Sequence, residues 1–191
     1  YLVMRHERGR SLHDHIKSQR GPLEELWVRN TFAQLLDGLR EVHKNKLLHL
    51  DLKPANVYLR EDGTPLLIDF GAARQILSAE GMKLPPTYTP GYAPPEMHVH
   101  TRRDELGPWS DVYSVGATMY GCFASAAPPP ANARLQRDQL LPASRAFAGK
   151  YAADLLEIVD WCLRLDPRQR PQSLLSLQKA LLGEKPDYRP G

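Results

Sequence analysis

The sequence contains little cysteine, no long apolar run and no excess of charge of one sign. Its two cysteines in 191 residues, Cys122 and Cys162, lie in apolar helical stretches, so we expect buried reduced thiols, which suit the reducing cytoplasm. No run approaches the roughly 18 apolar residues of a membrane-spanning helix, so no membrane segment is expected in this chain, although an anchor could lie elsewhere in a longer protein. The net charge of +3 comes from scattered Lys and Arg, which form no basic stripe for a nucleic acid.

The length and the first residues together indicate one lobe of a larger domain. A chain of 191 residues with 42% apolar and 25% charged residues suits one globular core. It opens on Tyr1–Met4, an apolar run typical of a buried strand, with no start methionine or N-cap before it. Because natural domains seldom begin inside a strand, we expect a piece of a longer protein.

Helical periodicity predicts most of the secondary structure. Ser11 is a suitable N-cap for a short helix to about Gln19. A longer helix is predicted over 24–44, with these residues on its buried face: Leu26, Phe32, Leu35, Leu36, Leu39 and Val42. Further helices are predicted over 109–123, 154–165 and 173–182, and prolines 128–130 predict a stiff connector.

Between the helices the period changes to that of a small β-hairpin. Residues 56–59 and 65–68 are short apolar runs on either side of the turn Glu61-Asp62-Gly63. Residues 71–92 contain three prolines and no sustained period, which predicts a long irregular loop of the kind that often carries function. The predicted fold class is therefore mainly α with a small β-hairpin.

Four polar residues surround this hairpin. Asp51, Lys53 and Asn56 lie just before its first strand, and Asp69 follows its second strand. Because a hairpin brings its two open ends together, we expect these side chains to converge. Carboxylate and amide oxygens suit a hard cation such as Mg²⁺, and a lysine beside them suits a transferring phosphate. These parts match phosphoryl transfer.

The motifs that contain these residues resemble those of protein kinases. The segment 49–56, His-Leu-Asp-Leu-Lys-Pro-Ala-Asn, is similar to the catalytic loop, and Asp-Phe-Gly at 69–71 is similar to the metal-binding motif. The resemblance implies the C-terminal (large) lobe of the protein-kinase-like α+β fold. It also implies transfer of the γ-phosphate of ATP to a Ser or Thr hydroxyl of a protein substrate. Segments 69–74 and 94–96 look similar to bacterial members of the family.

The resemblance implies a role for each of these residues. Asp51 would be the catalytic base, Lys53 would lie near the γ-phosphate, and Thr89 would hydrogen-bond both. Asn56 and Asp69 would be ligands of Mg²⁺, with Mn²⁺ as an alternative ion.

Downstream segments resemble the family in the same order. Residues 89–96 are similar to the substrate-docking loop, and we refer to them as the docking segment. By the same resemblance, Asp111 binds backbone amides of the catalytic loop, Arg170 forms a buried ion pair with Glu96, and His49 packs beneath Phe70.

Two residues depart from the family pattern. Leu50 replaces the arginine that pairs with a phosphorylated activation loop in the family, so we expect phosphorylation of that loop, for instance at Thr87, not to be the main on-switch. Tyr58 stands where leucine is usual in the floor of the adenine pocket, and its ring can still stack on adenine.

The resemblance also divides the chain. It implies a hinge region at 1–10, the catalytic loop and metal-binding hairpin at 47–71, an activation segment at 69–96 and a helical core at 110–182, all within one large lobe spanning 1–191. Residues implied to contact ATP are Met4, Arg5, Glu7, Ser11 and Tyr58. The small lobe that completes the ATP site is expected to be missing, so we expect the fragment alone to be inactive.

Three alternatives remain open at this point. Leu50 and Tyr58 also suit a pseudokinase or scaffold lobe used for protein docking. A small-molecule phosphotransferase shares the catalytic and metal aspartates but not the docking segment. Two His-x-His pairs, at 13/15 and 98/100, would need a further ligand to hold zinc, which favours surface histidines.

Overall fold

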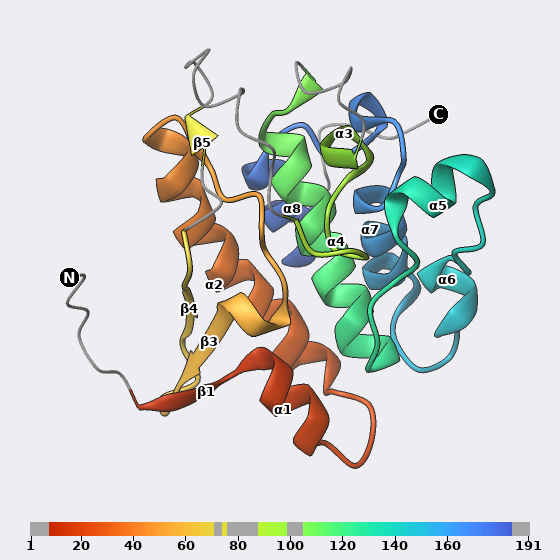
Figure 1. Cartoon of the computed structure of the whole chain (residues 1–191). Helices are drawn as coiled ribbons and strands as arrows, with labels where there is room; N and C mark the ends of the chain where they lie inside the picture. The colour runs from red at the N-terminus through yellow and green to blue at the C-terminus, as the bar shows by residue number, and fades with distance from the viewer. Residues whose placement is uncertain (1–7, 71–73, 76–87, 99–104, 185–191) are drawn as a thin grey trace.

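The computed structural model describes residues 8–70, 74–75, 88–98 and 105–184, and shows helices packed beside a small antiparallel sheet (Figure 1). The helices are α1 (Leu12–Ser18), α2 (Glu25–Lys44), α3 (Pro95–His98), α4 (Pro108–Ala124), α5 (Ala131–Gln136), α6 (Ala143–Ala146), α7 (Ala153–Cys162) and α8 (Leu174–Leu181), with short 3-10 turns η1 (Pro54–Asn56) and η3 (Pro167–Gln169). The strands are β1 (Gly9–Ser11), β2 (Leu47–Leu48), β3 (Val57–Arg60), β4 (Pro65–Leu67) and β5 (Arg74–Gln75). This architecture confirms the predicted mainly helical class.

Helix α2 lies under the sheet and follows the prediction except at one residue. Phe32 and Leu36 are fully buried, as expected, but Leu26 is 61% exposed and its predicted burial is wrong. The buried face is centred on Val28 and the residues four, seven and eight positions later. At about 100° per residue, Leu26 points away from that face.

Helix α4 is the central helix of the lobe. It is buried along nearly its whole length, and it packs against α7 at one close point. A Cβ on Gly116 would lie 2.4 Å from the Cβ of Cys162, so the close approach of the two helices requires glycine there. Cys122 and Cys162 are both buried and free, as predicted, and burial raises the pKa of both thiols.

The predicted hairpin is present, and the structure adds a third strand. β3 and β4 pair antiparallel, and β1 pairs with the other edge of β3 to give the order β1-β3-β4. Residues 9–11 were predicted as part of a polar turn and the start of a helix, because Gly-Arg-Ser carries no apolar alternation. A second pair, β2 with β5, places a short strand in the segment predicted to be irregular.

Three short helices escaped prediction. α3, α5 and α6 contain four to six residues each, too few to display a helical apolar period. α6 is capped from a distant helix, because Asp160 of α7 accepts hydrogen bonds from the amides of Ala143 (2.6 Å) and Ser144 (3.1 Å). α7 ends at Cys162, three residues before the predicted end.

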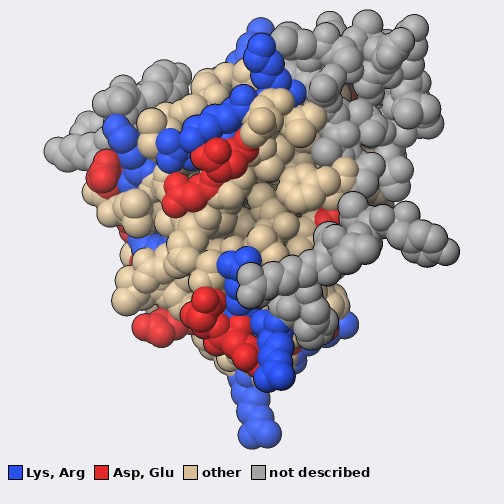
Figure 2. Space-filling view, turned by 90° about the vertical axis from the view of Figure 1, so that its left-hand side faces the viewer, with Lys and Arg blue, Asp and Glu red and all other residues tan. Residues whose placement is uncertain are grey.

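The charged surface is mixed. On the face shown in Figure 2, acidic and basic side chains lie beside one another in two groups, at the upper left and at the bottom, with uncharged surface between them. Among the described residues, there is also no helix with the length and apolarity that crossing a bilayer demands.

Candidate active site

The loop between β2 and η1 is fixed by a buried carboxylate at the start of α4. Asp111 is fully buried and accepts hydrogen bonds from the amides of His49 (2.9 Å) and Leu50 (2.8 Å), which confirms the predicted contact. His43 Nε2 also lies 2.7 Å from Asp111 Oδ2, a partner that the sequence did not indicate. Leu50 has a φ of 61°, a left-handed conformation that costs a non-glycine residue free energy unless its surroundings hold it. The two amide contacts with Asp111 hold this loop.

Asp51, Lys53 and Thr89 form a closed triangle of hydrogen bonds. Lys53 Nζ donates to Asp51 Oδ2 (2.8 Å) and to Thr89 Oγ1 (2.7 Å), and Thr89 Oγ1 donates to Asp51 Oδ1 (2.8 Å). The predicted hydrogen bonds of Thr89 are therefore confirmed. The side chains of Lys53 and Asp51 remain 22% and 15% exposed, so both are partly accessible to solvent.

Asn56 is positioned by the 3-10 turn η1 and faces the same aspartate. Its amide nitrogen donates to the Asp51 backbone oxygen (2.8 Å) and to Asp51 Oδ2 (3.1 Å). Among the described residues, no hydrogen bond uses its side-chain oxygen, which is thereby available to a cation.

Asp69 lies two residues after the end of β4 and has a φ of 61°. The amide of its neighbour Ile68 donates to the Asn56 backbone oxygen (3.0 Å), which joins the two ends of the hairpin. Within the described ranges, no cluster of three His, Cys, Asp or Glu side chains could hold a metal. One amide oxygen and one carboxylate nevertheless fit Mg²⁺, which commonly binds one or two protein oxygens and completes its shell with water and substrate phosphates.

His49 lies behind these residues and packs against Phe70, as predicted. Their ring centroids are 5.0 Å apart with a 59° angle between the planes. His49 Nδ1 accepts from the Asp51 amide (3.3 Å), and His49 Nε2 lies 3.3 Å from the Ile68 oxygen. Nδ1 therefore holds the loop itself and Nε2 connects it to the residue after β4, which is a packing role.

Leu50 takes part in a small apolar cluster that the sequence did not reveal. It is 2% exposed and clusters with Leu48, Ala93 and Met97, with Leu106 packed against them. Ala93 belongs to the docking segment and Met97 to α3. The residue that replaces the usual arginine thus joins the catalytic loop to the docking segment through apolar contact.

Glu96 and Arg170 form the predicted buried ion pair. Arg170 Nη1 and Nη2 donate to the two Glu96 carboxylate oxygens at 2.8 and 3.1 Å, and both side chains are fully buried. Ser110 Oγ also donates to Glu96 (2.8 Å), so the end of the docking segment is fixed to α4.

The residues expected to contact ATP are only partly within the described structure. Met4, Arg5 and Glu7, like Thr87, lie outside the described residues. Ser11 and Tyr58 face each other as register partners on β1 and β3. The Ser11 hydroxyl caps α1, as predicted, by accepting from the Asp14 amide (3.0 Å).

The paired histidines show different surroundings. His15 stacks on Trp27 with centroids 4.7 Å apart, and its Nδ1 lies 2.7 Å from Arg10 Nη2. His98 is half-buried against Tyr88 and not a surface residue as expected, because the ring of Tyr88 covers it at 4.4 Å. His100 lies outside the described residues.

The fold and the site together define a helical lobe with a carboxylate, a lysine and an amide at the open end of a hairpin, parts suited to phosphoryl transfer. Comparison with known families gives the same result: the model described as "Protein kinase domain" matches residues 1–182. The chain belongs to the protein kinase domain family.

Individual relatives agree. Mouse "Serine/threonine-protein kinase Nek3" is 30% identical over 189 residues, covering 95% of this chain and 36% of that protein. Mouse "Ribosomal protein S6 kinase alpha-2" is 32% identical over 186 residues, covering 89% of this chain and 24% of that protein. The solved structure of "PpkA-294 apo form" is similar with a TM-score of 0.79 at 28% identity, covering 92% of this chain and 61% of that one. The chain therefore spans less than half the length of these two curated relatives.

Proposed function

We propose that the whole protein is a Ser/Thr protein kinase that transfers the γ-phosphate of ATP to a protein hydroxyl. One observation carries the proposal: Lys53 is held between Asp51 and Thr89 with one N–H donor left over among the described contacts. An ammonium group has three N–H donors, and among the described residues two of them are used, by Asp51 and Thr89. The third is available to a phosphate oxygen beside the Asp51 carboxylate.

In this proposal each side chain of the triangle has one task. Asp51 accepts the proton of the substrate hydroxyl as that oxygen attacks the phosphorus. Lys53 stabilises the negative charge on the transferring phosphoryl group. Thr89 fixes the positions of both, so that little reorganisation is needed during the reaction.

The metal ligands in the proposal are Asn56 and Asp69, which would hold Mg²⁺, or Mn²⁺ in its place. When bound, the ion neutralises charge on the ATP phosphates. Asn56 is oriented for this by its two hydrogen bonds to Asp51, which turn its oxygen away from that residue.

The wider assignments are also proposals. ATP would contact Met4, Arg5, Glu7, Ser11 and Tyr58, and the acceptor would be a protein that lies along the docking segment. The free, buried cysteines favour a cytoplasmic location. The domain divisions given by the sequence motifs remain predictions.

A scaffold without catalysis is the second candidate, and Leu50 is the observation that favours it. Its apolar cluster holds the docking segment without any phosphate, as a binding surface would require. The intact triangle favours catalysis, because binding a partner protein does not require a partly exposed lysine hydrogen-bonded to a partly exposed carboxylate. A small-molecule phosphotransferase is less favoured, because the docking segment is held in place by the Glu96–Arg170 pair.

The test is Asp51→Asn in the whole protein, assayed with Mg-ATP and a Ser- and Thr-containing protein substrate. Loss of the base should lower kcat by about 10²- to 10⁴-fold. The matched control is Asp62→Asn, which alters an exposed turn aspartate of the same hairpin and should leave kcat unchanged. No phosphate transfer by the unmodified protein would favour the scaffold, and equal transfer by the unmodified and Asp51→Asn proteins would show that Asp51 is not the base.

A further inference from the structure

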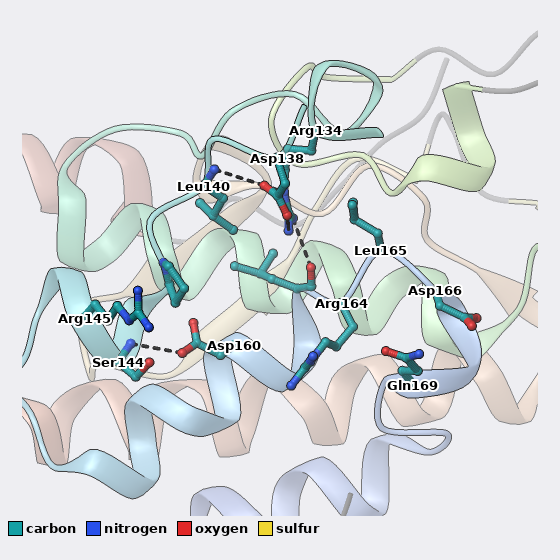
Figure 3. A pocket seen from close by; sticks show the side chains of 12 residues that line it. Arg134, Asp138, Leu140, Ser144, Arg145, Asp160, Arg164, Leu165, Asp166 and Gln169 are labelled. Carbon is teal, nitrogen blue, oxygen red and sulfur yellow. Dashed lines mark hydrogen bonds and ion pairs between the residues drawn. The ribbon is translucent and has the colours of Figure 1, made fainter. Parts of the chain in front are cut away.

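A pocket of about 600 Å³ lies among α5, α6, the end of α7 and η3. Helices α5 and α6, which carry part of its lining, are on the far side of the helical core from the β1-β3-β4 sheet (Figure 1). Its lining contains three arginines and three aspartates: Arg134, Arg145, Arg164, Asp138, Asp160 and Asp166 (Figure 3). The proposed kinase chemistry uses none of them.

The three aspartates already have partners. Asp138 receives two hydrogen bonds from Arg134, both at 2.9 Å, and these lower the pKa of its carboxyl group. Asp160 accepts the two amides at the start of α6 (Figure 3). Asp166 binds Arg168, which lies outside the pocket lining. Two of the three carboxylates are therefore paired with arginines, and the third, Asp160, is hydrogen-bonded to neutral amides.

Two of the three arginines are not compensated in the same way. Arg145 of α6 and Arg164, just after α7, are both exposed. In the part of the chain that the structure describes, neither guanidinium group has a hydrogen bond or an ion pair. In the view of Figure 3 they lie on either side of Asp160. Two guanidinium groups without a partner among the described residues therefore border a pocket in which each carboxylate already accepts a hydrogen bond.

Buried arginines hold the pocket wall in place. Arg134 donates to the Leu163 oxygen (3.0 Å), and Arg170 donates to the oxygens of Arg164 (2.7 Å) and Leu165 (3.1 Å). The backbone that carries Arg164 is thereby fixed before any ligand arrives. A preformed site avoids the entropy cost of ordering a loop on binding.

We propose that this pocket docks an acidic segment of a partner protein, whose oxyanions bind Arg145 and Arg164. A guanidinium group forms paired hydrogen bonds with carboxylate oxygens, so the oxyanions are the carboxylates of Glu or Asp. Leu140, Pro142 and Leu165 supply apolar wall for a neighbouring aliphatic side chain. None of the described lining residues is aromatic, so a nucleobase would lack a ring to stack on, which favours a peptide over a nucleotide.

The test is fluorescence polarisation with the full chain and short labelled peptides in about 150 mM salt, where long-range attraction is screened. One peptide has the core Leu-Glu-Glu-Leu, a second has Leu-Gln-Gln-Leu, and a third carries phosphoserine in place of the glutamates. The double variant Arg145→Gln/Arg164→Gln removes both guanidinium groups. The control, Arg137→Gln/Lys150→Gln, removes the same charge from exposed residues outside the lining.

The glutamate peptide should bind, and tighter binding of the phosphoserine peptide would overturn the choice of a carboxylate as the oxyanion. Loss of both guanidinium groups should weaken binding of the glutamate peptide about tenfold or more, because hydrogen bonds to charged groups are lost. The control variant should bind the peptide as tightly as the unmodified chain does. The proposal is overturned by no binding at about 1 mM peptide, by equal binding of the glutamine peptide, or by equal loss in the control. Unchanged urea unfolding of the double variant excludes loss through misfolding, and because no activity is measured, the result is independent of the proposed kinase function.

Discussion

The Asp51–Lys53–Thr89 triangle and the Glu96–Arg170 pair each join a carboxylate to a cationic side chain. They differ in their capacity to bind a further ligand. Arg170 uses all five of its N–H donors, two on Glu96 and three on the backbone oxygens of Trp109, Arg164 and Leu165. Among the described residues, Lys53 uses two of its three donors and stays partly exposed. A saturated, buried cation holds structure together, whereas an unsaturated, accessible one can bind a ligand.

Replacing Arg170 should give the largest loss of stability. Arg170→Met leaves the Glu96 carboxylate buried without its cation, which costs about 3–5 kcal/mol in the free energy of unfolding. Urea unfolding measures this. The matched control is Arg168→Met, since Arg168 pairs with Asp166 but is 87% exposed, and loss of an exposed pair costs about 0–1 kcal/mol.

A second variant sharpens the same point. Glu96→Met added to Arg170→Met removes the unpaired charge and should recover part of the lost stability. A loss below about 1 kcal/mol in Arg170→Met alone would mean that the pair does not hold the docking segment in place.

A substitution within the triangle should lower the activity of the protein and leave its stability nearly unchanged. Thr89→Val removes the hydroxyl that joins Lys53 to Asp51, and kcat/KM of the whole protein should fall about 10- to 100-fold, as expected for one or two hydrogen bonds to charged groups. Thr89→Ser keeps the hydroxyl and should retain most of the activity. If Thr89→Ser loses as much as Thr89→Val, or if Thr89→Val unfolds as easily as Arg170→Met, the contrast between the two regions is wrong.

The parts of the site that were predictable from the sequence are those fixed by short-range motifs. Asp51, Lys53 and Asn56 lie within six residues of one another, and the hairpin returns the chain to them through a turn with a recognisable composition. Helix α4 was predictable because apolar residues predominate along its length. The contacts of Thr89, Glu96 and Asp111 followed only from resemblance to a family.

The parts that escaped prediction depend on contacts between distant segments. β1 forms by pairing with β3, about fifty residues later, and carries no strand pattern of its own. The hydrogen bond from His43 to Asp111 joins α2 to α4, and neither residue has a local feature that indicates it. From the sequence, Leu50 indicated only that the usual arginine is absent. Its apolar contacts with Ala93 and Met97 could not be predicted, because only the folded chain brings these residues together.

The smallest expected effect is on kcat when phosphate is removed from the protein. It depends on Leu50, which lies between the triangle and the segment that ends at the Glu96–Arg170 pair. Because Leu50 is 2% exposed among apolar side chains of the docking segment and α3, these contacts need no phosphate to form. Phosphatase treatment of the whole protein should therefore change kcat by less than about twofold, since the arginine that would pair with a phosphate is absent.

Variants of Leu50 test the same point. Leu50→Met, which preserves apolar volume, should show the same small change in kcat on phosphatase treatment. Leu50→Arg places a cation in the apolar cluster and should lower activity whether or not the protein is phosphorylated. Near-complete loss of activity on dephosphorylation of the unmodified protein would show that a phosphate, and not the Leu50 cluster, positions the docking segment.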